Sequence, residues 1–218
     1  MGSETELKIA ELFYSIQGES SYAGYPCFFI RFADCNLRCT YCDTRYAYEG
    51  AHQSYTISRI LADLEKYPGV LVEITGGEPL LQEGVYSLID ELLALDRTVL
   101  LETNGSLSLE NVPQGVVKIM DMKCPGSGMH EKMNFDNFTF MSPKDEIKFV
   151  ISTQEDYTWA TGLVSSYGLP DMATVTFSPV TARLTPEILA AWILADRLPV
   201  RLRLQLHTIL WPGKTKGY

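Results

Sequence analysis

Strand-like and helix-like runs alternate along this chain, and this alternation restricts its fold more than any other feature. Short runs rich in apolar or β-branched residues predict strands over residues 27–33, 70–75, 98–102, 116–121, 146–151, 174–178 and 201–206. Apolar residues at helical spacing predict helices over residues 58–66, 85–95, 155–166 and 186–196. The alternation predicts a mostly parallel sheet with helices outside.

The number of strand–helix units falls short of the eight in a closed barrel. We therefore expect an α/β fold, an incomplete TIM-like βα barrel. The 218 residues fit a single domain over residues 1–218. Residues 124–143, the longest segment without a clear period, are expected to form a loop over the site.

Composition narrows the class of function. A formal net charge of −9 argues against nucleic acid as a partner and favours a small-molecule substrate. No apolar run approaches the roughly 20 residues that span a bilayer, so no membrane partner is expected. The odd number of cysteines and the lack of a visible export signal favour reduced thiols and a cytoplasmic location.

Residues that could act in binding or catalysis follow the predicted strands. Parallel α/β barrels place their active sites at this end of the strands. In strand order they are a cysteine loop, the GGEP sequence at 76–79, the TNG sequence at 103–105, Met122 with Lys123, Ser152, Ser178 with Pro179, and His207. Ordinary polar turns explain any one of these positions but not all of them together.

Three cysteines, Cys35, Cys39 and Cys42, have the spacing C-x-x-x-C-x-x-C. A four-iron cluster normally takes one cysteine thiolate per iron, so three cysteines leave one iron open to another ligand. Zinc would require paired C-x-x-C motifs or a cysteine–histidine foursome, although His52 remains a possible fourth ligand. The spacing favours a [4Fe-4S] cluster over zinc, and a disulfide is the least favoured alternative.

The cysteine loop, with the aromatic Tyr41 before its last cysteine, resembles the signature of the radical S-adenosylmethionine (SAM) enzymes. The sequence ITGGEP at 74–79 resembles the GGEP motif of that family. The resemblance implies that SAM chelates the open iron and is cleaved to a 5′-deoxyadenosyl radical. It implies SAM-binding roles for Tyr41, Asp43, Gly77, Glu78, Asn104, Asp121, Met122, Lys123 and Ser152.

Further motifs are more specific: FYSIQGES at 13–20, FIRFADCNL at 29–37, CDT at 42–44, DMKCP at 121–125 and QLH at 205–207. Together they resemble the 7-carboxy-7-deazaguanine synthases, radical SAM lyases of 7-deazapurine (queuosine precursor) biosynthesis. The resemblance implies the substrate 6-carboxy-5,6,7,8-tetrahydropterin. Implied substrate contacts are Ile16, Gln17, Gly18, Arg31, Thr75 and His207.

Arg31 stands within a short apolar strand, where a charged side chain needs a partner. The resemblance implies that it grips the substrate carboxylate, and a planar guanidinium suits this task. The alternative is an internal salt bridge with Glu73 or Glu102. The resemblance also implies that Thr44 ligates Mg²⁺, which retains waters and borrows oxygen ligands from substrate.

The implied reaction is a radical ring contraction that begins with hydrogen removal from C6 of the pterin and ends with loss of ammonia. An electron donor such as flavodoxin and a homodimer are also implied. A radical SAM activase of a glycyl radical enzyme is the alternative enzyme class, and it would need no carboxylate-binding Arg31. An iron–sulfur electron carrier or a structural zinc protein is the non-enzymatic alternative.

Overall fold

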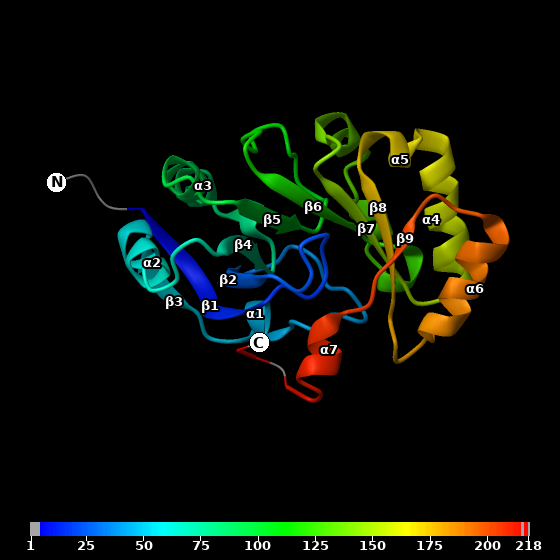
Figure 1. The fold of residues 1–218 in the computed structure, drawn as a ribbon, viewed down its shortest axis with the longest axis horizontal. Helices are drawn as coiled ribbons and strands as arrows, with labels where there is room; N and C mark the ends of the chain where they lie inside the picture. The colour runs from blue at the N-terminus through cyan, green and yellow to red at the C-terminus, as the bar shows by residue number, and fades with distance from the viewer. Residues whose placement is uncertain (1–4, 215, 218) are drawn as a thin grey trace.

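The structure, a computed structural model, describes residues 5–214 and 216–217. Within these residues nine strands form one sheet in the order β3-β1-β2-β4-β5-β6-β7-β8-β9 (Figure 1). The strands are β1 (Glu6–Ile16), β2 (Pro26–Phe32), β3 (Gln53–Thr56), β4 (Leu71–Gly76), β5 (Val99–Thr103), β6 (Val117–Met122), β7 (Glu146–Ile151), β8 (Thr174–Pro179) and β9 (Arg201–Leu202).

The strands β2, β4, β5, β6, β7, β8 and β9 pair in parallel in that order, whereas β1 pairs antiparallel with both β2 and β3. The sheet ends at β3 on one side and at β9 on the other, so it does not close on itself. The expected incomplete βα barrel is therefore confirmed, with two antiparallel strands added at its first edge.

The α-helices and the short 3₁₀ helices (η) connect the strands. They are α1 (Tyr46–Glu49), α2 (Ile57–Leu64), η1 (Pro79–Leu81), α3 (Gly84–Ala94), η2 (Pro125–Ser127), η3 (His130–Lys132), η4 (Phe135–Phe140), α4 (Gln154–Tyr167), α5 (Leu169–Met172), α6 (Pro186–Asp196) and α7 (Leu206–Leu210). Figure 1 shows α2 and α3 beside the first strands of the sheet and α4, α5 and α6 beside the last. The expected loop over 124–143 contains η2, η3 and η4.

Local sequence signals explain where several helices begin. The hydroxyl of Thr153 accepts a hydrogen bond from the Asp156 amide at the start of α4, a typical N-cap. Thr185 caps α6 in the same way, and Pro186 occupies the first turn, where its missing N–H costs no hydrogen bond. The core lies between the helices and the sheet and includes the fully buried Phe149 and Phe177.

All seven expected strands are present, with ends shifted by a residue or so except at the last one. Expected strand 201–206 is wrong after Leu202, because the chain leaves the sheet edge and enters α7. His207 consequently lies in a helix rather than after a strand. The expectation also missed β1 and β3, so the strand that precedes the cysteine loop is the second strand of the chain.

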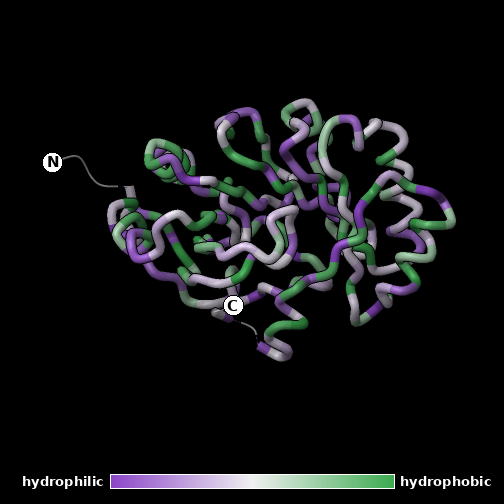
Figure 2. Tube along the Cα trace, in the orientation of Figure 1, coloured by the Kyte–Doolittle hydropathy of each residue, from purple (hydrophilic) through white to green (hydrophobic). Residues whose placement is uncertain are grey.

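Figure 2 shows apolar and polar residues mixed along each of the outer helices. This mixture fits helices with one face on the sheet and one in water. No helix in the described part of the chain has both the length and the hydropathy needed to cross a bilayer.

Candidate functional site

A cavity of about 320 Å³ opens at the carboxyl ends of the parallel strands. Two segments far apart in the sequence, 16–19 and 205–207, complete its wall. Most residues indicated by the sequence line it: Ile16, Gln17, Gly18, Arg31, Cys35, Cys39, Tyr41, Cys42, Asp43, Thr44, Thr75, Gly77, Asn104, Asp121, Lys123 and His207. Glu78, Met122 and Ser152 are buried and stand outside the lining.

The three motif cysteines line this cavity, half-buried and with free thiols. Cys27 and Cys124 are fully buried and do not reach it. Burial raises the pKa of the Cys39 thiol to about 11, although the Lys123 ammonium partly offsets this effect. His52, the possible fourth ligand, is exposed and lies outside the lining. Among the described residues the lining therefore supplies three cysteine thiols and no fourth. This donor set fits a four-iron cluster with one open iron.

The glycine pair Gly76-Gly77 at the end of β4 lets the cysteine loop pack closely. A Cβ on Gly77 would lie 2.0 Å from the carbonyl oxygen of Asp34, and Gly76 has a φ of 147° that only glycine adopts easily. The Gly77 amide donates to the Phe32 carbonyl over 3.0 Å. The GG sequence is therefore required by backbone contact with the start of the cysteine loop, besides any contact with a ligand.

Glu78 is fully buried and its carboxylate is occupied within the protein. It accepts hydrogen bonds from the Leu80 amide over 3.0 Å, the Thr103 hydroxyl over 2.9 Å and the Asn104 amide over 2.7 Å. Burial raises the pKa of Glu78, and these donors partly offset the rise. The side chain therefore joins the loop after β4 to the end of β5, and it stands behind the lining residue Gly77.

The remaining expected SAM contacts divide into lining and supporting residues. The Tyr41 hydroxyl donates to the Val150 carbonyl over 3.2 Å, which holds its ring in the cavity wall. The Ser152 hydroxyl instead donates to Asp156 over 2.6 Å and is 2% exposed. Met122 is fully buried among the core residues. Ser152 and Met122 therefore support the wall from behind.

Asp121 and Lys123 form an ion pair of 2.6 Å in the lining. Burial alone would lower the pKa of Lys123, but Asp121 and Cys39 outweigh it, so the net pKa is raised. The other carboxylate oxygen of Asp121, Oδ1, is buried without a hydrogen-bond partner in the described structure. A buried acceptor of this kind fits a ligand that brings a hydroxyl or an ammonium group.

Arg31 projects from β2 into the cavity with its side chain 17% exposed. It forms an ion pair with Glu11 at 3.8 Å, and not the expected alternative pair with Glu73 or Glu102. The guanidinium lies over the rings of Phe13 and Tyr46 at 5.4 and 5.9 Å. Its Nε is buried without a hydrogen-bond partner in the described residues, so this donor is available to an anion.

The Gln17 side chain is engaged inside the protein rather than free for a ligand. Its Nε2 donates to Glu73, and its Oε1 accepts from the amides of Glu19 and Ser20 over 2.6 and 3.2 Å. Burial and the nearby charge of Glu102 raise the pKa of Glu73 well above its usual value. Glu73 is thus a buried carboxyl of raised pKa in the lining, and Gln17 shapes the loop that follows β1.

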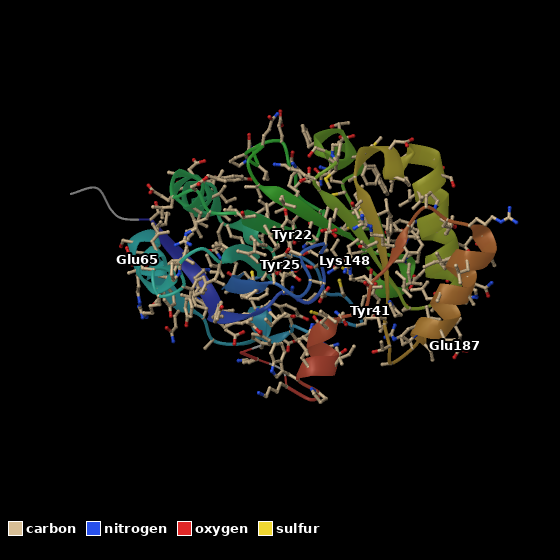
Figure 3. The ribbon with its side chains drawn as sticks, in the orientation of Figure 1. Tyr22, Tyr25, Tyr41, Glu65, Lys148 and Glu187 are labelled. Atoms are coloured by element: carbon tan, nitrogen blue, oxygen red, sulfur yellow. The ribbon has the colours of Figure 1, made fainter. Side chains whose placement is uncertain are left out.

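A cluster of buried charges was missed by the sequence analysis. Lys148 in β7 lies 2.5 Å from Glu102, 2.8 Å from Glu19 and 3.7 Å from Asp121. Burial raises the pKa of Glu102, but Lys148 and Thr75 lower it to about 2 overall. Figure 3 shows Lys148 in the central part of the molecule, with Glu65 on one side of it and Glu187 on the other. A lysine inside the apolar run 146–151 was the available signal.

Thr44 lies beside other oxygen and nitrogen donors. Its hydroxyl donates to Asp43 Oδ1 over 2.8 Å. The ligand atoms of Asp43, Glu19 and His207 lie within 4.8 Å of one another. The expected substrate-binding residue His207 is thus brought to the cavity by α7, with its Nδ1 3.8 Å from Glu19.

Comparisons with known proteins agree with this geometry. The Radical SAM superfamily matches residues 29–122, which run from within β2 through the cysteine loop to the end of β6. The chain is 44% identical to the 7-carboxy-7-deazaguanine synthase of Koribacter versatilis (strain Ellin345), over 97% of this chain and 100% of that protein. It is 43% identical to the synthase of Chlorobaculum tepidum, over the full length of both.

The fold is also that of a solved structure. The crystal structure of QueE from Escherichia coli superposes with a TM-score of 0.76 at 20% identity, covering 92% of this chain and 94% of that one. An open βα barrel with three cysteines at its carboxyl end defines a radical SAM enzyme. Within that class, the chain belongs to the 7-carboxy-7-deazaguanine synthase family. The resemblance given by the motifs is confirmed, and the glycyl-radical activase alternative gains no support from these relatives.

Proposed function

We propose that this chain converts 6-carboxy-5,6,7,8-tetrahydropterin into 7-carboxy-7-deazaguanine with release of ammonia. The name of the family gives the product, and one observation on this chain supports the chemistry. A single cavity contains the three cysteine thiols, an arginine Nε without a partner and a wall of carboxylates. The reaction conserves atoms, because the pterin loses one nitrogen and three hydrogens as ammonia while its six-membered ring contracts.

The cysteine end of the cavity suits the [4Fe-4S] cluster and SAM, which when bound supply a 5′-deoxyadenosyl radical. Cys35, Cys39 and Cys42 would hold the cluster. Asp121 Oδ1 offers a buried acceptor for a SAM hydroxyl or ammonium group, and Lys123 offers a cation for a carboxylate. Gly77 and Asn104 line the wall between them, while Tyr41 covers the side toward β7.

The other end suits the carboxypterin. Arg31 would bind the substrate carboxylate, since its Nε is buried without a hydrogen bond and its ion pair with Glu11 is long, at 3.8 Å. The fused ring carries several N–H donors, which match the carboxylate and carbonyl acceptors of the wall. Thr75 holds Glu102 through a hydrogen bond of 3.0 Å, and Ile16 and Gly18 supply main-chain groups.

We further propose that Mg²⁺ binds beside Thr44 and Asp43. Asp43 is a carboxylate, which is a preferred magnesium ligand, and the neighbouring hydroxyl of Thr44 adds a second oxygen. Water and a substrate oxygen would complete the shell. The ion would fix the end of the substrate that faces the cysteine loop and would neutralise part of the acidic wall.

Four broader expectations belong to the same proposal. Residues 1–218 act as one radical SAM domain, an electron donor such as flavodoxin supplies the reducing equivalent, the enzyme works in the cytoplasm, and two copies form a homodimer. The free cysteines and the lack of a long apolar helix among the described residues are compatible with the cytoplasm. The cluster's one-electron chemistry requires a donor.

A product assay tests the proposal. Anaerobically reconstituted protein is incubated with SAM, Mg²⁺, a reductant and 6-carboxytetrahydropterin, and the products are separated by mass. We expect 7-carboxy-7-deazaguanine and ammonia in equal amounts. Cleavage of SAM without formation of the deazapurine would show a radical SAM enzyme with a different substrate and would overturn the assignment.

A further inference from the structure

A buried lysine links the wall of the cavity to the segments that cover it. Lys148 Nζ contacts Glu102 of β5, Asp121 of β6 and Glu19 of the loop between β1 and β2. The side chain of Lys148 is 6% exposed. A cation at this depth is retained when it has several charged partners, and removing it leaves those carboxylates buried and unpaired.

Glu19 connects Lys148 to the 205–207 segment. Its Oε2 accepts from Lys148, whereas its Oε1 accepts from Gln205 Nε2 over 3.0 Å and faces His207 Nδ1 at 3.8 Å. The two oxygens of one carboxylate therefore join the barrel wall to the segment just before and within α7. That segment also holds the Glu19 loop directly, because the Leu206 amide donates to the Gly18 carbonyl over 3.1 Å.

The Glu19 loop has a few further contacts with the barrel. Its inner hydrogen bonds join Gln17 to Gly24 and to Tyr25, and the Gln17 side chain reaches Glu73. Beyond these, the Ser21 amide donates to Glu146 over 2.6 Å, and the Ser21 hydroxyl accepts from Arg201 of β9 over 3.2 Å. Tyr22 packs against buried side chains of β5 and β6, so the link through Glu19 adds to these contacts at the end of the loop that faces the cavity. In the view of Figure 3, Tyr22 and Tyr25 of this loop and Lys148 all project onto the central part of the molecule.

We propose that Lys148 is a positioning residue that, through Glu19, holds the Glu19 loop and the 205–207 segment closed over the substrate end of the cavity. This inference rests on the proposed function for the identity of the substrate. Lys148 touches no cysteine of the cluster loop in the described structure. Its loss should therefore leave the cluster intact. It should weaken substrate binding much more than SAM binding, because Asp121 keeps its shorter ion pair with Lys123 at 2.6 Å.

A second buried lysine provides the matched control. Lys118 at the start of β6 pairs with Asp145 at 2.9 Å, and their side chains are 5% and 0% exposed. This pair lies outside the cavity lining. Lys148→Met and Lys118→Met both remove a buried cation, so any general effect on folding should appear in both variants. An effect on substrate should appear only in Lys148→Met.

The test has two readouts on the reconstituted enzyme. Hydrogen–deuterium exchange without substrate should show faster exchange at residues 17–25 and 203–210 in Lys148→Met and not in Lys118→Met. Kinetics should show the KM for carboxytetrahydropterin raised about tenfold or more, with SAM affinity within about twofold of the wild type. Lys148→Arg should recover part of the loss because it keeps the charge.

Glu19→Gln supplies a variant should Lys148→Met fail to fold, because it keeps the size of the side chain and breaks the same link. In the double variant the two losses should be strongly non-additive, since both remove one interaction. Unchanged exchange in both segments overturns the tether, whatever the substrate proves to be. Faster exchange with an unchanged KM overturns the positioning role. Failure of the product assay alone counts against the proposed function and leaves the exchange result valid.

Discussion

The two ends of the cavity are built in different ways. The cysteine end comes from short, continuous motifs: one loop with three thiols, and a glycine pair packed against it by backbone contact. The substrate end is assembled from single side chains on β2, β4, β5, β7, the Glu19 loop and α7, and charge pairs hold it together. The first kind of site is visible as a motif, whereas the second becomes visible only when the strands are placed side by side.

This difference predicts separable defects. Substitutions in the cysteine loop should act on the cluster and on SAM together, because SAM would bind the iron that the three cysteines leave open. Substitutions at the substrate end should change substrate affinity or pH dependence and leave the cluster unaffected.

The largest effect is expected at the cluster. Cys39→Ala should remove one of three cluster ligands and abolish both the four-iron cluster and turnover, measured by iron content and electron paramagnetic resonance. Cys27→Ala is the matched control, since Cys27 is a free thiol that is buried away from the cavity. An intact four-iron spectrum in Cys39→Ala would refute the ligand assignment.

A smaller but specific effect is expected at Arg31. Arg31→Ala should raise the KM for the carboxypterin roughly ten- to hundredfold, because a charge-assisted hydrogen bond contributes about 1.5–3 kcal/mol. SAM affinity, measured by calorimetry, should change little. Arg59→Ala is a control, since Arg59 also lies over a tyrosine ring, at 4.3 Å, but on α2 outside the cavity. Equal losses of SAM and substrate affinity would contradict the separation of the two ends.

The buried carboxylates of the substrate end should respond oppositely to pH. The pKa of Glu73 is raised by burial and by Glu102, so the folded state keeps a proton that the unfolded chain loses above about pH 4.3. Stability due to Glu73 therefore falls as pH rises through that value. Glu73→Gln should be more thermostable than the wild type at pH 8, with a smaller gain at pH 5.

Glu102 gives the opposite sign and serves as the comparison. Lys148 and Thr75 lower its pKa to about 2, so its contribution is complete above about pH 4.3 and is lost only as pH falls toward 2. Glu102→Gln should therefore be less thermostable than the wild type by a nearly constant amount from pH 5 to pH 8. Parallel pH curves for the Glu73 and Glu102 variants, measured by calorimetry, would be evidence against this charge assignment.

The smallest effect is expected at the magnesium position. Thr44→Ala should lose several-fold stimulation by Mg²⁺, whereas Thr44→Ser keeps the hydroxyl and should retain it. The measurement is turnover at saturating substrate with and without the ion. Stimulation that is the same in both variants would remove Thr44 from the metal site.

Much of the parallel part of the fold was predictable because its strands are short apolar runs bounded by turn residues. The alternation of Leu7 and Ile9 with charged residues in β1 was also a usable signal, and both side chains are buried. No such signal marks β3, which has only four residues. The end of the last strand at Leu202 could not be predicted, because it depends on a contact between segments distant in the sequence. After the chain has left β9, the Leu206 amide donates to the Gly18 carbonyl.

The site divides along the same line. Cys35, Cys39, Cys42 and Gly77 could be found because contiguous motifs carry them. Lys148 could be suspected from its place in an apolar strand, but its three partners come from segments 27 to 129 residues away in the chain. Glu78 was found by its motif, although only the structure shows that its carboxylate is used to hold Thr103 and Asn104.

The central claim is that three cysteines leave one iron open inside this cavity. Mössbauer spectroscopy of the reconstituted ⁵⁷Fe protein, with and without SAM, tests it most directly. The account predicts one iron distinct from the other three, with parameters that change when SAM is added. Four iron signals that are all insensitive to SAM would contradict it.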